Sequence, residues 1–239
     1  MPKHVLITGG SRGIGRELVL AFSKEGYRVS FTYNRSVDEA KALADVSGAL
    51  AFHADHSDVT QISSLIREVT SANGDVDVLI NNAGVSHYGL FQDVSLLDFQ
   101  QVFAVDFQSP FFLTKELVSS MISRKSGVII NVASIWGETG ASCEVLYSSA
   151  KGALIAFTKA LAKELAPSGI CVNCISPGVV DTDMMARFSA EEKELLKEEI
   201  PAGHFTDPKE ITQLALFLAN HPSTSLTGQI IGLNGGMFC

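Results

Sequence analysis

Seven short apolar runs that alternate with segments of helical periodicity constrain this chain more than any other feature. The runs are rich in Val, Ile and Leu, and strands that are apolar along their whole length are typical of a sheet buried on both faces. Between them, apolar residues recur at helical spacing. This alternation predicts an α/β fold, a parallel sheet with helices on both faces. The runs lie at residues 5–7, 29–33, 49–54, 76–80, 128–132, 170–175 and 229–233, and the longest helical patterns at 58–72, 95–123 and 147–166.

Composition excludes several classes of protein. Of 239 residues, 46% are hydrophobic and 18% are charged, which is enough apolar material for a core and rules out a disordered chain. The net charge of −8 argues against a nucleic-acid partner, because phosphate backbones require clustered Lys and Arg. We find no apolar run of the ~18 residues that a membrane span needs. Four cysteines are too few for a disulfide scaffold, so we expect a cytoplasmic protein.

A glycine-rich turn directly follows the first apolar run. Residues 8–15 read TGGSRGIG, and a helical pattern begins within them. The glycines let the backbone approach a pyrophosphate, and the amino terminus of the helix offers unpaired N–H groups to it. This strand–turn–helix context predicts a dinucleotide-binding loop.

The end of the second strand favours NADP(H) over NAD(H). An NAD site usually has an acidic residue there for the ribose 2′-hydroxyl, whereas residues 32–35 read TYNR. Arg12 in the glycine loop and Arg35 could each contact a 2′-phosphate through charge-assisted hydrogen bonds. A solvated surface arginine is an equally good interpretation of Arg35 alone, so Arg12 is the stronger candidate.

The middle of the chain carries a second constellation of polar side chains. Tyr147 and Lys151 are four residues apart and therefore share one face of a predicted helix. Ser134 ends the strand thirteen residues before Tyr147. The segments NNAG at 81–84 and Pro177-Gly178 each follow a predicted strand.

Together these motifs, in this order and spacing, resemble the short-chain dehydrogenase/reductase family over the whole chain. The resemblance implies a Rossmann-type doubly wound parallel sheet in a single NADP-binding domain, 1–239. It also implies a homotetramer, with the helices at 95–123 and 147–166 forming one interface. The cofactor-binding residues it implies are Gly9, Ser11, Arg12, Gly13, Ile14, Gly15, Asn34, Arg35, Asp55, Asn82, Ala83, Gly84, Tyr147, Lys151, Pro177, Gly178 and Thr182.

The implied chemistry is the reduction of a ketone, which receives hydride at carbon and a proton at oxygen. Tyr147 would donate the proton, and Lys151 would lower the phenol's pKa, since one opposite charge moves a pKa by about 1–3 units. Ser134 would hold the substrate oxygen as it gains charge. A non-catalytic NADP-binding sensor is the alternative from another class, but such proteins usually lose the tyrosine or the lysine.

One residue departs from the family pattern. Where the family usually has Asn, helping to hold a water that leads to Lys151, this chain has Asp106. A carboxylate accepts from such a water but cannot donate, and it could instead pair directly with Lys151. A cap on a helix turn is the simpler alternative, so we include Asp106 among the catalytic candidates without defining its role.

Two substrate classes compete. The C-terminal half resembles 3-oxoacyl-[acyl-carrier-protein] reductases, whereas the loop at 134–147 resembles bacterial elongation factor P 5-aminopentanone reductases. The latter reduce a ketone built onto a lysine of the translation factor. We expect Glu138 and Glu144 to rim the pocket and to favour a protonated amine, although both could be ordinary solvent-exposed acids. Trp136 could stack on the substrate or simply pack.

Three further expectations concern the surroundings of the site. Carrier-protein reductases present a basic pair beside the active site, and here Arg124 and Lys125 remain but residues 167–169 read PSG. The charged stretch at 189–199 predicts a solvated helix, within a possible substrate lid at about 181–205. Cys171 and Cys174 lie three apart in a strand and point to opposite faces, so we expect no metal.

Overall fold

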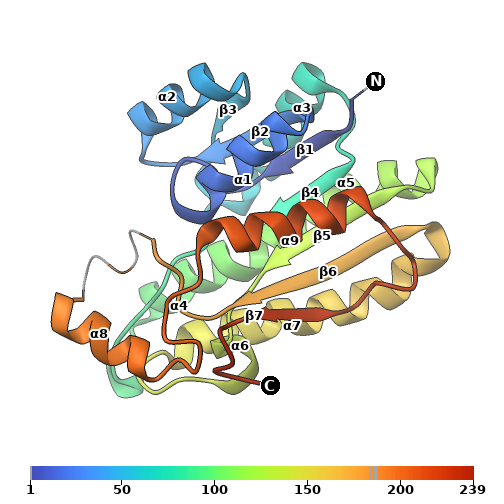
Figure 1. Ribbon diagram of the computed structural model, residues 1–239. Helices are drawn as coiled ribbons and strands as arrows, with labels where there is room; N and C mark the ends of the chain where they lie inside the picture. The colour runs from blue at the N-terminus through green and yellow to red at the C-terminus, as the bar shows by residue number, and fades with distance from the viewer. Residues whose placement is uncertain (1, 183–184, 186–187) are drawn as a thin grey trace.

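The computed structural model describes residues 2–182, 185 and 188–239, and within them one seven-stranded sheet forms the centre of the molecule (Figure 1). All neighbouring strands pair in parallel, in the order β3-β2-β1-β4-β5-β6-β7. The predicted doubly wound sheet is confirmed. Its strands are β1 (His4–Ile7), β2 (Arg28–Tyr33), β3 (Leu50–His53), β4 (Val78–Asn81), β5 (Gly127–Val132), β6 (Ile170–Pro177) and β7 (Ile230–Leu233).

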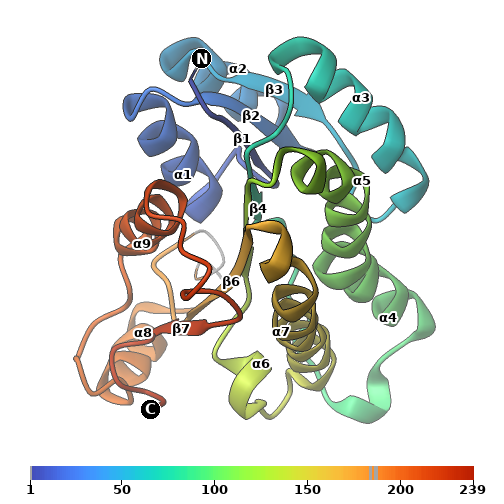
Figure 2. The same ribbon diagram turned by 90° about the vertical axis from the view of Figure 1, so that its right-hand side faces the viewer.

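Helices cover both faces of the sheet (Figure 2). Among the described residues, no helix is long and apolar enough to cross a membrane. The helices are α1 (Gly13–Lys24), α2 (Val37–Ser47), α3 (Ile62–Asn73), α4 (Leu96–Phe103), α5 (Ser109–Arg124), α6 (Trp136–Thr139), α7 (Val145–Leu165), α8 (Ala190–Glu198) and α9 (Pro208–Asn220). The predicted solvated helix at 189–199 is therefore α8.

Two apolar clusters lie on opposite faces of the sheet because successive strand side chains point to opposite sides. Val5 and Ile7 of β1 face α1, α2 and α9, while Leu6 between them faces α3, α5 and α7. The central strands β1, β4 and β5 are buried along their whole length. This two-sided burial is the physical reason that the strands read as continuous apolar runs.

The helix predicted at 95–123 is interrupted. A π-helical turn, Ala104–Gln108, separates α4 from α5 and contains Asp106. Pro110 stands at the start of α5 and has no N–H to donate to the Asp106 carbonyl, so the regular α-helical hydrogen bond is lost there. Periodicity alone does not reveal such a turn, because one extra residue hardly changes the apolar spacing.

Buried polar side chains attach α7 to the sheet. The Asn81 amide of β4 donates to Asn131 Oδ1 of β5 at 2.8 Å, and the Asn131 amide donates to Thr158 Oγ1 of α7 at 2.8 Å. All three side chains are buried. Because an unpaired polar group costs about 1–3 kcal/mol when buried, these bonds restrict how α7 can lie on the sheet. The helix that carries Tyr147 and Lys151 is thereby positioned.

Candidate active site

A cavity of about 1110 Å³ opens at the carboxyl edge of the sheet, lined by the segments that follow β1, β2, β4, β5 and β6. In doubly wound folds ligands bind at this edge, where the strand order reverses. Here the reversal is at β1, which pairs with both β2 and β4. All the residues predicted to bind the cofactor line the cavity.

The glycine loop forms one wall without room for side chains. A Cβ placed on Gly15 would lie 2.1 Å from the Gly9 carbonyl oxygen and 2.8 Å from the Asn82 amide nitrogen. Arg12 precedes α1 in an extended conformation, and no side-chain cap is described at this helix end. The first N–H groups of α1 therefore remain available to a phosphate group, which fits a dinucleotide.

Thr8 joins the glycine loop to the turn after β4. Its hydroxyl accepts from the backbone N–H groups of Asn82 and Ala83, each at 2.9 Å, and the Asn82 side chain donates to the Thr8 carbonyl at 2.9 Å. Thr8 opens the glycine motif, whose pattern by itself assigns the residue no role. A hydroxyl directly after an apolar strand is the signal that could indicate this role.

Two arginines and an aspartate lie at the far end of the cavity. Arg12 and Arg35 are both exposed and both line this part of the cavity, and Asn34 lies beside Arg35. Asp55 accepts from the Ser57 hydroxyl at 2.7 Å and from its N–H at 2.9 Å, and these bonds lower the pKa of the carboxyl. The cavity thus offers two guanidinium groups near one ionised carboxylate.

His56 is a buried residue that sequence reasoning missed. Its ring nitrogens lie 2.7 Å from Thr32 Oγ1 and 2.6 Å from Ser109 Oγ, so it joins β2 to the start of α5. Burial lowers the pKa of His56 to about 4, and the ring is therefore neutral at pH 7. Thr32 Oγ1 in turn accepts from the Gly9 N–H at 3.0 Å, which extends the chain of contacts to the glycine loop. Nothing in the local sequence pattern distinguishes this histidine from a surface one.

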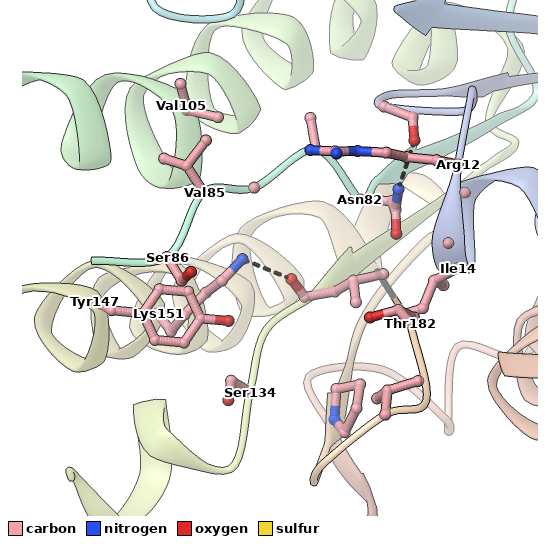
Figure 3. A pocket seen from close by; sticks show the side chains of 18 of the residues that line it. Arg12, Ile14, Asn82, Val85, Ser86, Val105, Ser134, Tyr147, Lys151 and Thr182 are labelled. Atoms are coloured by element: carbon pink, nitrogen blue, oxygen red, sulfur yellow. Dashed lines mark hydrogen bonds between the residues drawn. The ribbon is translucent and has the colours of Figure 1, made fainter. Parts of the chain in front are cut away.

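Ser134, Tyr147 and Lys151 come together at the other end of the cavity (Figure 3). The Lys151 ammonium donates to the Val132 carbonyl at 3.1 Å and lies 5.6 Å from the centre of the Tyr147 ring. Ser134 Oγ accepts from the Trp136 N–H at 3.2 Å. In Figure 3 the Tyr147 hydroxyl lies between Ser134 and the Lys151 ammonium.

The protonation of Tyr147 depends on opposing influences. Burial raises the pKa of the phenol, Lys151 lowers it, Asp106 raises it and a hydrogen bond with Ser134 lowers it. The net result is a pKa above the ordinary value, so the phenol carries its proton at neutral pH. The site can therefore hold a proton ready for a nearby oxygen.

Asp106 lies beneath this site, not on the cavity wall. Its Oδ1 accepts from the Val85 N–H at 2.8 Å, and its Oδ2 lies 3.1 Å from Lys151 Nζ, with both side chains buried. Direct pairing with Lys151, one of the three roles considered for this residue, matches this geometry.

The acidic residues of the 134–147 segment differ in position. Glu144 lines the cavity together with Trp136, whereas Glu138 is not among the lining residues. Glu138 instead accepts a hydrogen bond of 2.5 Å from the hydroxyl of Ser176 in β6. The expectation that Glu138 rims the pocket is wrong, because the single turn of α6 directs it toward the sheet.

The basic pair considered for carrier-protein docking, Arg124 and Lys125, is not near the cavity. Arg124 ends α5 at the amino edge of the sheet, opposite the cavity, where it pairs with Asp75 at 2.8 Å and Asp77 at 3.7 Å. It also donates to the Val76 carbonyl. Lys125 follows it as the left-handed cap of α5. Within one chain, therefore, this pair is not beside the active site.

Among the residues described, no group of three or more His, Cys, Asp or Glu side chains could hold a metal ion. Cys171 and Cys174 are free and buried in β6, and burial raises the pKa of the Cys174 thiol to about 12. Neither thiol is therefore suited to nucleophilic chemistry.

Known proteins resemble this chain along its length. The family model described as short chain dehydrogenase matches residues 3–193. An uncharacterized oxidoreductase of Bacillus subtilis is 43% identical, with all of both chains covered. A 3-oxoacyl-[acyl-carrier-protein] reductase of Aquifex aeolicus is 38% identical over 99% of this chain and 97% of its own. A blue fluorescent protein from a metagenomic library, solved in complex with NADPH, is 31% identical with a TM-score of 0.92, over 99% and 98% of the two chains.

The tight contact at Gly15 allows a test of the glycine loop. We expect Gly15→Ala to weaken NADPH binding at least about tenfold, because the new methyl group displaces backbone that faces the nucleotide. Gly89→Ala is the control, since its Cβ would meet only His87 at 3.5 Å, an ordinary contact. Titration of NADPH fluorescence measures both, and equal affinities for Gly15→Ala and the native protein would contradict this account of the loop.

Proposed function

This chain belongs to the short-chain dehydrogenase/reductase family, and from that membership we propose that it is an NADPH-dependent ketone reductase. Membership makes it an oxidoreductase that acts on a carbonyl or hydroxyl group. The observation that carries the proposal is the convergence of Ser134, Tyr147 and Lys151 on a cavity whose other end is the glycine loop. A complete set of this kind also argues against a non-catalytic NADP-binding sensor.

The chain's own groups handle the proton and the developing charge. A bound nicotinamide would supply the hydride. Ser134 Oγ holds the substrate oxygen, and Tyr147 donates its phenolic proton to that oxygen as charge develops on it. The Lys151 ammonium stabilises the tyrosinate that remains until solvent returns the proton. Burial of Ser134 and Lys151 strengthens these interactions by excluding water.

The preference for NADPH follows from the charges at the far end of the cavity. Arg12 and Arg35 line it, and Asn34 stands where an NAD site usually has an acid. A guanidinium binds a phosphate group through two parallel hydrogen bonds. A structurally similar protein was solved with NADPH, which agrees with this proposal.

We expect the native enzyme to favour NADPH over NADH by at least about tenfold in kcat/KM, since a charge-assisted bond contributes about 1.5–3 kcal/mol. Arg12→Ala should reduce that ratio. Arg67→Ala removes the same charge from an exposed position of α3, away from the cavity, and should preserve it. Steady-state kinetics with both cofactors measures the ratios. Equal use of NADPH and NADH by the native enzyme would refute the cofactor assignment.

Replacing the phenol tests the chemistry. Tyr147→Phe removes the proton donor, so we expect kcat for ketone reduction to fall about 10²- to 10⁴-fold while NADPH affinity changes little. Tyr27→Phe removes a hydroxyl that bonds Asn220, remote from the cavity, and should keep native turnover. Ketone-dependent NADPH oxidation and NADPH binding are measured for both variants. A Tyr147→Phe enzyme with near-native kcat would remove Tyr147 from the mechanism.

For the substrate, we propose the 5-aminopentanone group on a lysine of elongation factor P. The resemblance of the 134–147 loop suggests it, and the charge of the cavity supports it. Glu144 is on the cavity wall, where a protonated amine gains from a carboxylate. The chain's net charge of −8 and the distance of Arg124 from the site both disfavour an acidic carrier protein.

The second candidate is 3-oxoacyl-[acyl-carrier-protein] reduction. Relatives with that name from Aquifex aeolicus and Staphylococcus aureus are 38% and 35% identical over nearly all of this chain. Their similarity extends across the whole sequence, so it does not single out the substrate-facing loop. The choice between the two substrates therefore depends on kinetics.

A charged and an uncharged ketone distinguish the two candidates. We expect kcat/KM for an aminoketone to exceed that for an acetoacetyl thioester, and the advantage to shrink with added salt. Glu144→Gln should lower kcat/KM for the aminoketone only. We expect a change of about threefold, because the ion pair between Glu144 and the amine is partly exposed. Glu138→Gln, the control, removes the same charge from a residue outside the cavity. A faster thioester reaction, unaffected by Glu144→Gln, would favour the carrier-protein substrate.

The biological substrate is tested by deletion of the gene. Mass spectrometry of elongation factor P from the deletion strain should show a lysine modification that stops at the ketone, two hydrogens lighter than the alcohol. Complementation with the native gene should restore the alcohol, and complementation with Tyr147→Phe should not. An unchanged modification would exclude this substrate.

Two further features remain proposals. Met185, Phe188 and Leu196, before and within α8, line the cavity, so we propose that residues 181–205 act as a lid; residues 183–184 and 186–187 lie outside the described residues. Phe111 of α5 is exposed, and its ring is 5.4 Å from that of Phe157 of α7. This apolar surface supports the proposed homotetramer.

A further inference from the structure

Asp106 and Lys151 form a buried pair of opposite charges under the proposed active site. Lys151 Nζ lies 3.1 Å from Asp106 Oδ2 and 3.1 Å from the Val132 carbonyl oxygen. Asp106 Oδ1 accepts from the Val85 N–H at 2.8 Å. Among the described residues, Asp106 Oδ2 has no hydrogen-bond donor other than this ammonium nearby. Oδ2 of the carboxylate is therefore paired with Lys151.

The backbone after β4 closes over this pair. A Cβ placed on Gly84 would lie 3.2 Å from Asp106 Oδ2 and 3.2 Å from Lys151 Nζ, so any side chain there would press on both charged groups. Asp106 is fully buried and is not among the cavity-lining residues, whereas Lys151 and Tyr147 are. The pair is consequently shielded from solvent, and the two charges interact more strongly than they would at the surface.

Seen from Tyr147, the Asp106 carboxylate offsets part of the charge of the Lys151 ammonium. A lone ammonium beside a phenol stabilises the tyrosinate and moves its pKa down by about 1–3 units. A carboxylate behind the ammonium opposes that effect, since it repels the tyrosinate. The balance decides whether the phenol keeps or releases its proton near neutral pH, and therefore over which pH range the site can donate that proton.

We propose that Asp106 is a positioning residue that pairs with Lys151 so that Tyr147 keeps its proton to higher pH, which widens the pH range over which the site can donate a proton to a ketone. The inference rests on the proposed reductase function and deepens it. Asp106 acts through Lys151, because it lies behind that residue and outside the cavity. With a neutral side chain at this position, the same chain would release the Tyr147 proton at a lower pH.

The other ionisable groups around the site do not reverse the effect of Asp106 on the protonation of Tyr147. Glu144, which precedes α7, raises the pKa of Tyr147, in the same direction as Asp106. Cys174 of β6 faces Lys151, and burial raises the pKa of its thiol to about 12, so it is neutral over the working range. Glu138 lies beside Cys174 and bonds Ser176. Burial alone would lower the pKa of Lys151, but Asp106 and Tyr147 act together against it, and the pKa is raised.

The first test is the pH dependence of alcohol oxidation with NADP⁺. Oxidation needs the tyrosinate, so its kcat/KM rises with pH until Tyr147 is ionised. For the native enzyme we expect that rise to continue beyond about pH 9, since a free phenol ionises near 10 and the influences that raise the pKa of Tyr147, burial above all, outweigh Lys151 and Ser134, which lower it. A plateau reached below about pH 8 would overturn the proposal, because it would mean that Lys151 acts on Tyr147 unopposed.

The second test is Asp106→Asn. The substituted amide can still accept from Val85 N–H but carries no charge. We expect the rising limb of oxidation, and the falling limb of ketone reduction, to move to lower pH by at least about one unit. Asp45→Asn, the control, removes one exposed carboxylate from α2 and should leave both limbs in place. Limbs that stay in place or move to higher pH in Asp106→Asn would overturn the proposal.

A measurement that does not depend on turnover distinguishes a failure of this proposal from a failure of the proposed function. The ultraviolet absorbance of tyrosinate, native minus Tyr147→Phe, titrates Tyr147 directly in a protein that need not reduce any ketone. We expect ionisation of Tyr147 at or above the pH of a free phenol. If all ketones fail as substrates but this titration holds, only the reductase assignment is lost. If Asp106→Asn does not fold, the native titration alone decides, and ionisation near neutral pH would overturn the inference.

Discussion

The site depends on one topological constraint, the pairing of β1 with β2 on one side and with β4 on the other. The chain leaves β1 into α1 on one face of the sheet, whereas the crossovers that lead to β5 and β6 cover the opposite face. The turns after β1 and β4 therefore diverge, and a crevice opens between them. Thr8 holds the two turns together at the base of that crevice through two hydrogen bonds of 2.9 Å.

Buried hydrogen bonds restrict the positions that α5 and α7 can take on the sheet. Asn81, Asn131 and Thr158 connect β4, β5 and α7, while His56 connects β2 to α5. Apolar packing tolerates small sliding movements, but a buried hydrogen bond is lost when its atoms separate, at a cost of about 1–3 kcal/mol per group. These contacts explain how residues from a strand end and from a helix can share one reaction space.

The two ends of the cavity differ in the charged groups that they present. Guanidinium groups and free helix N–H groups lie at the glycine-loop end and suit an anionic nucleotide. The opposite end contains a buried ion pair, a protonated phenol and a carboxylate on the wall. A carbonyl group that approaches this end meets a proton donor, with the Glu144 carboxylate on the cavity wall.

The strands, the glycine loop and the Ser134, Tyr147 and Lys151 set are predictable from the sequence, because each depends on neighbours within a few residues or on one recurring order of motifs. Contacts between distant elements are not. Glu138 turns toward β6, Arg124 lies at the opposite edge of the sheet, and His56 bridges β2 and α5. Sequence alone leaves three roles open for Asp106; the π-helical turn and the packing of α5 against α7 place it beside Lys151. Local spacing thus determines which side chains exist at a strand end or on a helix face, and only tertiary packing decides which of them meet.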